Sequence, residues 1–287
     1  MSMDWLMFAI LSAFFAGITS ILAKIGIRDI DSTVVTAMRT VVVTVFAWLM
    51  VFLIGSQSGI SGISSNTFLF LFLSGLTTGA SWLCYFKALE KGNVNKVVPI
   101  DKSSIVITVI LAVLILGEGL SPWGAAGIVF IAIGTMAMIE KKDTEKVAGG
   151  PWLLYAIGSA VFAALTSIFG KVGIEGVEST LGTAIRTLVV LAMSWMMVYV
   201  VGKQDEIRGI PRKAMGFVIA SGLATGASWL CFYRALQTGP ASVVVPIDKL
   251  SILVAVVFAF FLFGERLNRR ALAGLILIVA GTLMMLY

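Results

Sequence analysis

The chain has 287 residues, of which 59% are hydrophobic and 13% are charged, and its formal net charge is +6. This composition excludes an ordinary soluble domain, in which about a quarter of the residues are charged. The sequence contains no histidine and only two cysteines, so the commonest metal ligand and the usual general base are missing. We therefore expect no metal site, no cofactor and no enzymatic activity.

Ten apolar stretches follow one another along the chain. A membrane-spanning helix needs about 20 mostly apolar residues. On that template the predicted spans are residues 5–23, 33–54, 67–89, 97–116, 123–139, 152–170, 180–201, 214–236, 243–263 and 271–286. Runs of this length exceed what a tilted barrel strand needs, so the sequence predicts an all-α integral membrane protein with ten transmembrane helices.

The sequence repeats itself at an offset of 147 residues. The stretch GLTTGASWLCYFKALEKGNVNKVVPIDK begins at Gly75 and returns as GLATGASWLCFYRALQTGPASVVVPIDK from Gly222. We expect a first five-helix repeat over residues 1–140, a cytoplasmic linker over 141–150 and a second repeat over 151–287. Because five is odd, the second repeat enters the membrane from the opposite side, and the two repeats are predicted to be inverted.

The basic residues agree with an inverted arrangement. The loop over residues 55–66 has no Lys or Arg, whereas its counterpart over residues 202–213 has four. Over the whole chain, 16 basic residues fall on one predicted face and 3 on the other, leaving aside two arginines within spans. Cytoplasmic loops of membrane proteins are enriched in Lys and Arg, so both termini are predicted outside the cytoplasm, in a multi-pass protein of the cytoplasmic (inner) membrane.

Charged side chains within spans are costly and commonly mark a pathway, an ion pair or a water-filled cavity. The candidates for gating or coupling are Arg39, Asp101 and Lys102 with their equivalents Arg186, Asp248 and Lys249. Arg39 could pair with Asp101, and Arg186 with Asp248, because each pair starts from the same side of the membrane. A salt bridge that only fixes helix orientation is the alternative.

Further polar and aromatic positions recur in both repeats at corresponding depths. A Trp in the middle of a span cannot belong to the interfacial belt, so it either packs between helices or lines a pocket. Hydroxyl groups in spans bond to their own helix by default, and basic residues at span ends extend to the interface. The candidates for substrate binding are Trp82, Trp229, Tyr85, Tyr233, Thr19, Thr166, Lys24 and Lys171.

Each repeat carries a proline two residues before its acidic residue, Pro99 and Pro246 in the motif VVPIDK. A proline within a membrane helix leaves a backbone carbonyl without its usual donor, and such broken helices line substrate sites in inverted-repeat transporters. A proline that simply begins a helix is equally compatible with the sequence.

These features together resemble the drug/metabolite transporter superfamily, specifically its EamA-type members. The resemblance rests on two five-span repeats, an aromatic third span with small residues, the VVPIDK motif, and the Gly-Glu turns Gly117-Glu118 and Gly264-Glu265. It covers nearly the whole chain. The chain also resembles a fusion of two single-repeat relatives of about half its length.

The resemblance implies a secondary transporter that works by alternating access, with a cavity lined by helices one, three and four of each repeat. Small multidrug exporters of the superfamily carry a glutamate in their first helix, and residues 5–23 contain none. This departure disfavours proton-coupled export of lipophilic cations. The surplus of basic groups in and beside the spans instead favours a small polar metabolite, amino-acid-like or otherwise anionic or zwitterionic. Broad-specificity efflux by proton antiport is the alternative. The sequence favours a channel or a membrane-embedded enzyme less than either kind of transporter. The expected partners are this substrate and membrane lipid, with no nucleic acid, for a monomer or homodimer.

Overall fold

A computed structural model describes residues 4–26, 30–91, 94–138, 151–264 and 267–287, and within these ranges every regular element is a helix. The predicted all-α class is therefore confirmed for the described residues. The predicted linker over 141–150 lies outside them. The elements are α1 (Asp4–Gly26), α2 (Ser32–Ile54), η1 (Ser56–Gly62), α3 (Ser65–Lys91), α4 (Val94–Lys102), α5 (Ser104–Leu116), α6 (Pro122–Met138), α7 (Trp152–Glu175), α8 (Ser179–Val201), η2 (Gln204–Gly209), α9 (Arg212–Thr238), α10 (Ala241–Asp248), α11 (Ser251–Phe263) and α12 (Arg269–Met284).

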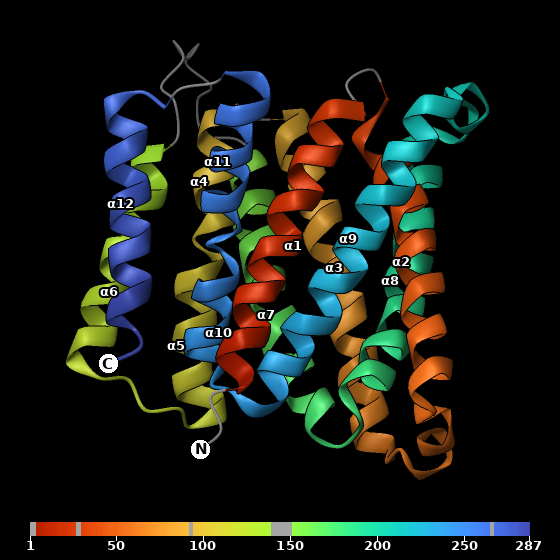
Figure 1. Cartoon of the computed structure of the whole chain (residues 1–287), viewed down its shortest axis with the longest axis horizontal. Coiled ribbons are helices and arrows are strands. Elements are labelled where there is room, and N and C mark those ends of the chain that lie inside the picture. The colour runs from red at the N-terminus through yellow and green to blue at the C-terminus, as the bar shows by residue number, and fades with distance from the viewer. Residues whose placement is uncertain (1–3, 27–29, 92–93, 139–150, 265–266) are drawn as a thin grey trace.

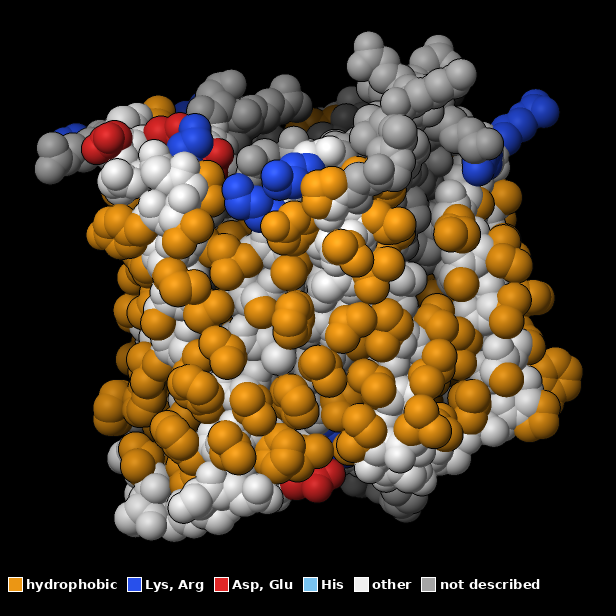
Figure 2. Space-filling view, turned by 180° about the vertical axis from the view of Figure 1, so that it is seen from behind, with side chains coloured by type: hydrophobic (Ala, Val, Ile, Leu, Met, Phe, Trp, Pro, Cys, Tyr) orange, Lys and Arg blue, Asp and Glu red, His pale blue; other side chains and the backbone are white. Residues whose placement is uncertain are grey.

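In the part of the chain that the structure describes, seven helical stretches are long and apolar enough to cross a membrane. They are α1, α2, α3, α7, α8, α9 and the stretch Ala241–Phe263 formed by α10 and α11, whereas α6 is a shorter apolar helix. Figure 2 shows the matching surface, a broad belt of hydrophobic side chains with Lys and Arg gathered at its upper end. The molecule is a multi-pass membrane protein.

Two of the predicted spans are not single helices. The stretch predicted over 97–116 consists of α4 and α5, which are separated at Ser103, and the stretch over 243–263 consists of α10 and α11, separated at Lys249 and Leu250. At the second break, backbone hydrogen bonds join residues three apart, as from Leu250 N–H to Ile247 O at 2.9 Å. Pro246 lies inside α10 and has no N–H to donate, which weakens the α-helical ladder just before the break.

The two halves of the chain are interleaved. Helix α1 of the first half packs along α9 of the second, and its counterpart α7 of the second half packs along α3 of the first. Each of these two pairs therefore contains one helix from each half. In Figure 1, α1 ascends from the lower end of the bundle whereas α7 descends from the upper end, and α1 begins at the same end at which α12 finishes. Contacts between the halves therefore decide which side chains meet in the centre.

Candidate functional site

A cavity of about 360 Å³ lies between the two halves, bounded by α1, α2, α3, α7, α8, α9 and α10. Its walls combine hydroxyl, aromatic and charged side chains. Nine of the residues predicted from the sequence line it, and they come from both halves: Thr19, Arg39, Trp82, Thr166, Arg186, Trp229, Tyr233, Asp248 and Lys249. A larger hollow of about 620 Å³ beside η2 and the start of α9 contains none of the predicted residues.

The remaining predicted residues lie elsewhere. Tyr85 packs beside the buried cluster that contains Ala88 and Trp152. Lys102 borders a small hollow against α6, and Asp101 does not line the central cavity. Lys171 lies at the end of α7, and the side chain of Lys24 is outside the described part of the structure. The structure therefore brings together most, but not all, of the predicted site.

Each aspartate accepts a hydrogen bond from a serine of the other half. Ser12 Oγ donates to Asp248 Oδ1 at 2.6 Å, and its equivalent Ser159 Oγ donates to Asp101 Oδ1 at 2.7 Å. A second serine completes each cluster: Ser228 Oγ donates to the Ser12 carbonyl at 3.0 Å, and Ser81 Oγ donates to the Ser159 carbonyl at 3.0 Å. Both clusters thus tie the broken helix of one half to the first helix of the other.

The ion pairs considered from the sequence do not form in this structure. Among the described residues, no ion pair joins Arg39 to Asp101 or Arg186 to Asp248. Arg186 instead donates from Nη2 to Thr78 Oγ1 at 2.6 Å and from Nε to Ser74 Oγ at 3.2 Å. The reason is that both hydroxyls belong to α3, which packs against α8, whereas Asp101 and Asp248 accept hydrogen bonds from serines.

Arg39 and Arg186 occupy equivalent positions but have different surroundings. Arg186 is 2% exposed, and its guanidinium carbon lies 5.1 Å from the ring centroid of Trp229 and 4.6 Å from that of Tyr233. Arg39 is partly exposed and lines the cavity, and it makes no hydrogen bond or ion pair with the described part of the chain. Two guanidinium nitrogens of Arg186 are thus bonded to the protein, whereas the donors of Arg39 are available to a ligand.

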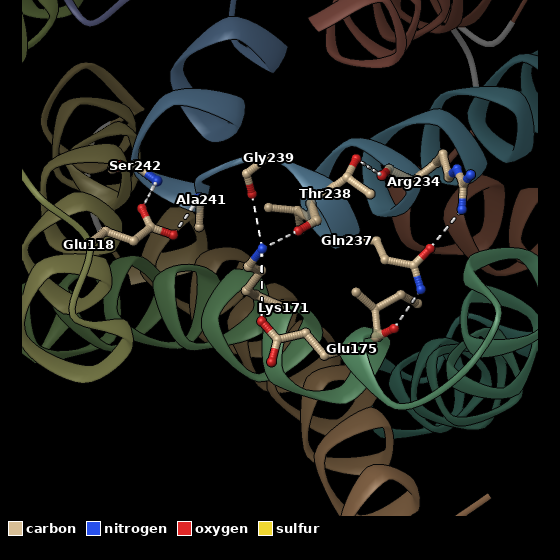
Figure 3. Close-up of polar contacts among 11 residues, drawn as sticks. Glu118, Lys171, Glu175, Arg234, Gln237, Thr238, Gly239, Ala241 and Ser242 are labelled. Atoms are coloured by element: carbon tan, nitrogen blue, oxygen red, sulfur yellow. Dashed lines mark hydrogen bonds and ion pairs between the residues drawn. The ribbon is translucent and has the colours of Figure 1, made fainter. Parts of the chain in front are cut away.

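A polar network lies at the end of the bundle where α7 and α9 finish, as Figure 3 shows. Lys171 Nζ donates to the carbonyls of Leu236 and Gly239, and Gln237 Nε2 donates to the carbonyls of Ile174 and Val177. Glu118 accepts from the backbone N–H groups of Ala241 and Ser242. Sequence reasoning gave Glu118 and Gln237 no role in a site. The repeated Gly-Glu turn was the available signal for Glu118, and Gln237 had none.

The fold and the cavity define a multi-pass helical membrane protein with a polar cavity between its two halves. The chain belongs to the EamA-like transporter family, whose pattern matches residues 3–139 and again residues 150–287. The predicted family is thus confirmed.

Several known proteins are similar to this chain. An uncharacterized transporter of a Sinorhizobium species is 45% identical over 134 residues, which cover 47% of this chain and 95% of that protein. The human solute carrier family 35 member G1 is 26% identical, covering 96% of this chain and 76% of its own. An S-adenosylmethionine uptake transporter of Rickettsia prowazekii is 26% identical, covering 63% and 58% respectively.

A solved crystal structure of a protein superposes on this chain with a TM-score of 0.73. The alignment covers 98% of this chain and 96% of the other, at 14% sequence identity. This likeness shows a shared fold and nothing finer.

Proposed function

We propose that this protein is a secondary transporter that moves a small anionic or zwitterionic metabolite through its central cavity by alternating access. The observation that carries the proposal is Arg39, a cation within a membrane span that lines the cavity without a partner among the described residues. A charge at that depth is costly unless it is compensated. A carboxylate or other anionic group of a substrate would supply the compensation through charge-assisted hydrogen bonds.

The other cavity walls suit a small amphipathic metabolite. Lys249 adds a cation to the two arginines, Asp248 supplies a carboxylate that can face a substrate ammonium group, and Trp82 and Trp229 offer flat apolar surfaces. A volume of about 360 Å³ fits a single small molecule rather than a polymer. The Rickettsia relative is named for S-adenosylmethionine, a cation overall that carries an amino-acid carboxylate and ammonium group, and this supports a substrate with an amino-acid-like portion.

The proposal includes the membrane topology. Two inverted five-helix halves, over 1–140 and 151–287, would cross the cytoplasmic membrane ten times with both termini outside. The opposite directions of α1 and α7 in Figure 1 and the uneven distribution of Lys and Arg support this arrangement. The Sinorhizobium relative supports it too, because its similarity to this chain covers 95% of its length but only 47% of ours.

Alternating access requires that equivalent groups of the two halves exchange surroundings. In this structure Asp248 and Lys249 line the cavity, whereas Asp101 and Lys102 do not. We expect the opposite state to expose Asp101 and Lys102 to the cavity and to withdraw Asp248 and Lys249, so that these four predicted gating residues act in turn.

The test is ligand-induced stabilisation of purified protein screened against small metabolites, because a ligand that binds only the folded state raises its apparent stability. A carboxylate-bearing metabolite should raise the melting temperature of the wild-type protein and of Arg270→Gln, a change at an exposed residue of α12. The same compound should leave Arg39→Gln unshifted. Equal stabilisation of all three proteins would rule out Arg39 as the anion receptor.

A further inference from the structure

Next to the cavity, where α7 and α9 finish, side chains bind the termini of neighbouring helices. We propose that Lys171, Gln237 and Glu118 form a latch that holds this end of the cavity closed, and that its release admits substrate from that face of the membrane. The inference rests on the proposed function, since a latch matters only where the cavity must open.

Lys171 and Gln237 bind α7 and α9 to each other in reciprocal fashion. Lys171, near the end of α7, donates from Nζ to Leu236 O at 2.6 Å and to Gly239 O at 2.9 Å, at the end of α9. Gln237, near the end of α9, donates from Nε2 to Ile174 O at 2.9 Å, at the end of α7, and to Val177 O at 2.7 Å, two residues past that end. The last carbonyls of a helix have no partner within it, so each side chain satisfies groups that would otherwise need water.

Glu118 binds the start of α10. It follows α5, and its two carboxylate oxygens accept from Ala241 N–H at 2.7 Å and Ser242 N–H at 2.8 Å, at the start of α10. The first N–H groups of a helix and its dipole both favour an anion there. The corner between α9 and α10 is therefore tied to α7 by Lys171 and Gln237 and to the α5–α6 turn by Glu118 (Figure 3).

The latch lies directly beyond the cavity. Tyr233 lines the cavity four residues before Gln237, which is about one helical turn, or roughly 6 Å. On α7, Gly170 precedes Lys171, and a Cβ at Gly170 would lie 2.6 Å from Cε1 of Tyr233. Helices α7 and α9 therefore contact each other at the cavity wall. The latch bonds lie about one helical turn farther toward the ends of these helices.

The contacts of the corner divide into those with α1 and those with α7 and the α5–α6 turn. A Cβ at Gly239 would lie 2.8 Å from the Trp5 ring, so the corner packs closely on the start of α1. Helix α1 also packs along α9. On this proposal α1, α9 and α10 move as one body against α7 and α5. The latch bonds are polar and can be exchanged for water as the bodies separate, whereas the apolar cluster that the bodies share, with Ile168, Ala112 and Val244, is partly uncovered.

The experiment measures access to the cavity without any substrate. A reporter cysteine replaces Ala163, which lines the cavity, in a chain with Cys84→Ala and Cys231→Ala. A membrane-impermeant maleimide is applied to spheroplasts and to inverted vesicles, so that each face is tested. The latch variants are Lys171→Met and Gln237→Glu, the second of which keeps the shape of the side chain while replacing its donor with an acceptor.

Each latch variant should label about tenfold faster from the face that carries residues 117–122 and 239–241, because loss of such hydrogen bonds shifts a two-state equilibrium by about that factor. The control Lys203→Met, which removes an exposed ion pair with Glu206 on η2, should label like the parent. Unchanged labelling from that face in Gln237→Glu, in protein with the parental melting temperature, would overturn the latch. It would leave the proposed substrate site untouched, because that site is tested by ligand binding.

Discussion

Arg186 is a charged residue that the fold has fully enclosed. Its guanidinium donates to Ser74 and Thr78 and lies against the rings of Trp229 and Tyr233. A planar guanidinium can donate in several directions and stack on an aromatic face at the same time, which a lysine ammonium cannot do.

Arg186→Lys should therefore lower the unfolding free energy by about 2 kcal/mol, since it leaves hydroxyls without a donor and a buried charge less well satisfied. Unfolding in mixed detergent micelles measures this, with Arg212→Lys at the exposed start of α9 as the matched control. Equal stability of the two variants would mean that the enclosure of Arg186 is not a source of stability.

Acidic side chains cap the same helix in both halves. Asp31 Oδ1 accepts from Thr33 N–H at 2.8 Å at the start of α2, and Glu178 accepts from the N–H groups of Thr180 and Leu181 at 2.9 and 3.0 Å at the start of α8. Burial by itself raises the pKa of the Glu178 carboxyl, but these backbone bonds and those from the Thr180 and Ser179 hydroxyls outweigh it, and the net pKa is lowered.

Because the folded-state pKa is lowered, the carboxylate of Glu178 stabilises the fold above its unfolded pKa and loses this effect as the pH falls through the folded value. Glu178→Gln should cost no more than about 1 kcal/mol at pH 7, the usual worth of an N-cap. The difference from wild type should shrink below about pH 4, the ordinary pKa range of glutamate. Melting temperatures recorded across pH, with exposed Asp205→Asn for comparison, test the sign. A difference that grows on acidification would contradict it.

Helices α6 and α12 pack with their backbones in close approach. A Cβ at Gly274 would lie 2.6 Å from the carbonyl oxygen of Gly134, and one at Gly281 would lie 2.5 Å from that of Gly127. These are equivalent glycines paired crosswise between the halves. Small residues at such positions let helices associate in lipid, where no hydrophobic force drives them together.

Gly274→Val should separate the pair and destabilise the protein by about 3 kcal/mol or more, because the obstacle is backbone and cannot rotate away. Gly216→Val is the control, since a Cβ at that glycine meets nothing within 4 Å. The melting temperatures of the two variants in detergent are compared. A similar decrease in both would show that the close approach of α6 and α12 does not contribute to stability.

Apolar length alone was enough to predict helices such as α1, α2 and α8. It could not place the interruptions at Ser103 and Lys249, because one proline is compatible with a helix start as well as with a break. Whether a helix breaks at such a point depends on whether its free backbone N–H and C=O groups find hydrogen-bond partners outside the helix. Those partners lie in elements that are distant in the sequence.

The same reason limits how much of the site could be predicted. Trp82 and Trp229 were accessible from sequence, because an aromatic in the middle of a span suggests a pocket. Ser12 was not, because its bond to Asp248 joins residues 236 positions apart across the two halves. The paired arginines occupy equivalent positions of the repeat and differ in the surroundings that the structure gives them.

At the scale of the whole molecule, the proposed inverted halves require both chain ends on one face. The test introduces single cysteines at Asp4 and at Tyr287, which are exposed at the start of α1 and at the end of the chain, in the background lacking Cys84 and Cys231. Both should react with an impermeant maleimide in spheroplasts and be protected in inverted vesicles.

The control for this labelling is Gln204→Cys, at the exposed first residue of η2, in the loop that the basic residues place in the cytoplasm. It should be protected in spheroplasts and react in inverted vesicles. Reaction of Asp4→Cys and Tyr287→Cys from different faces would contradict an even number of crossings.

The central claim is that a small anionic or zwitterionic metabolite crosses the membrane through the cavity that contains Arg39. Counterflow in proteoliposomes tests it most directly, using the carboxylate-bearing metabolite identified by stabilisation as the labelled probe. The account predicts saturable uptake that unlabelled metabolite inside the vesicles accelerates, that is retained in Arg270→Gln and that falls at least about tenfold in Arg39→Gln, the factor expected for loss of one charge-assisted contact. Uptake of equal rate in both variants, or flux that neither saturates nor responds to internal metabolite, would contradict it.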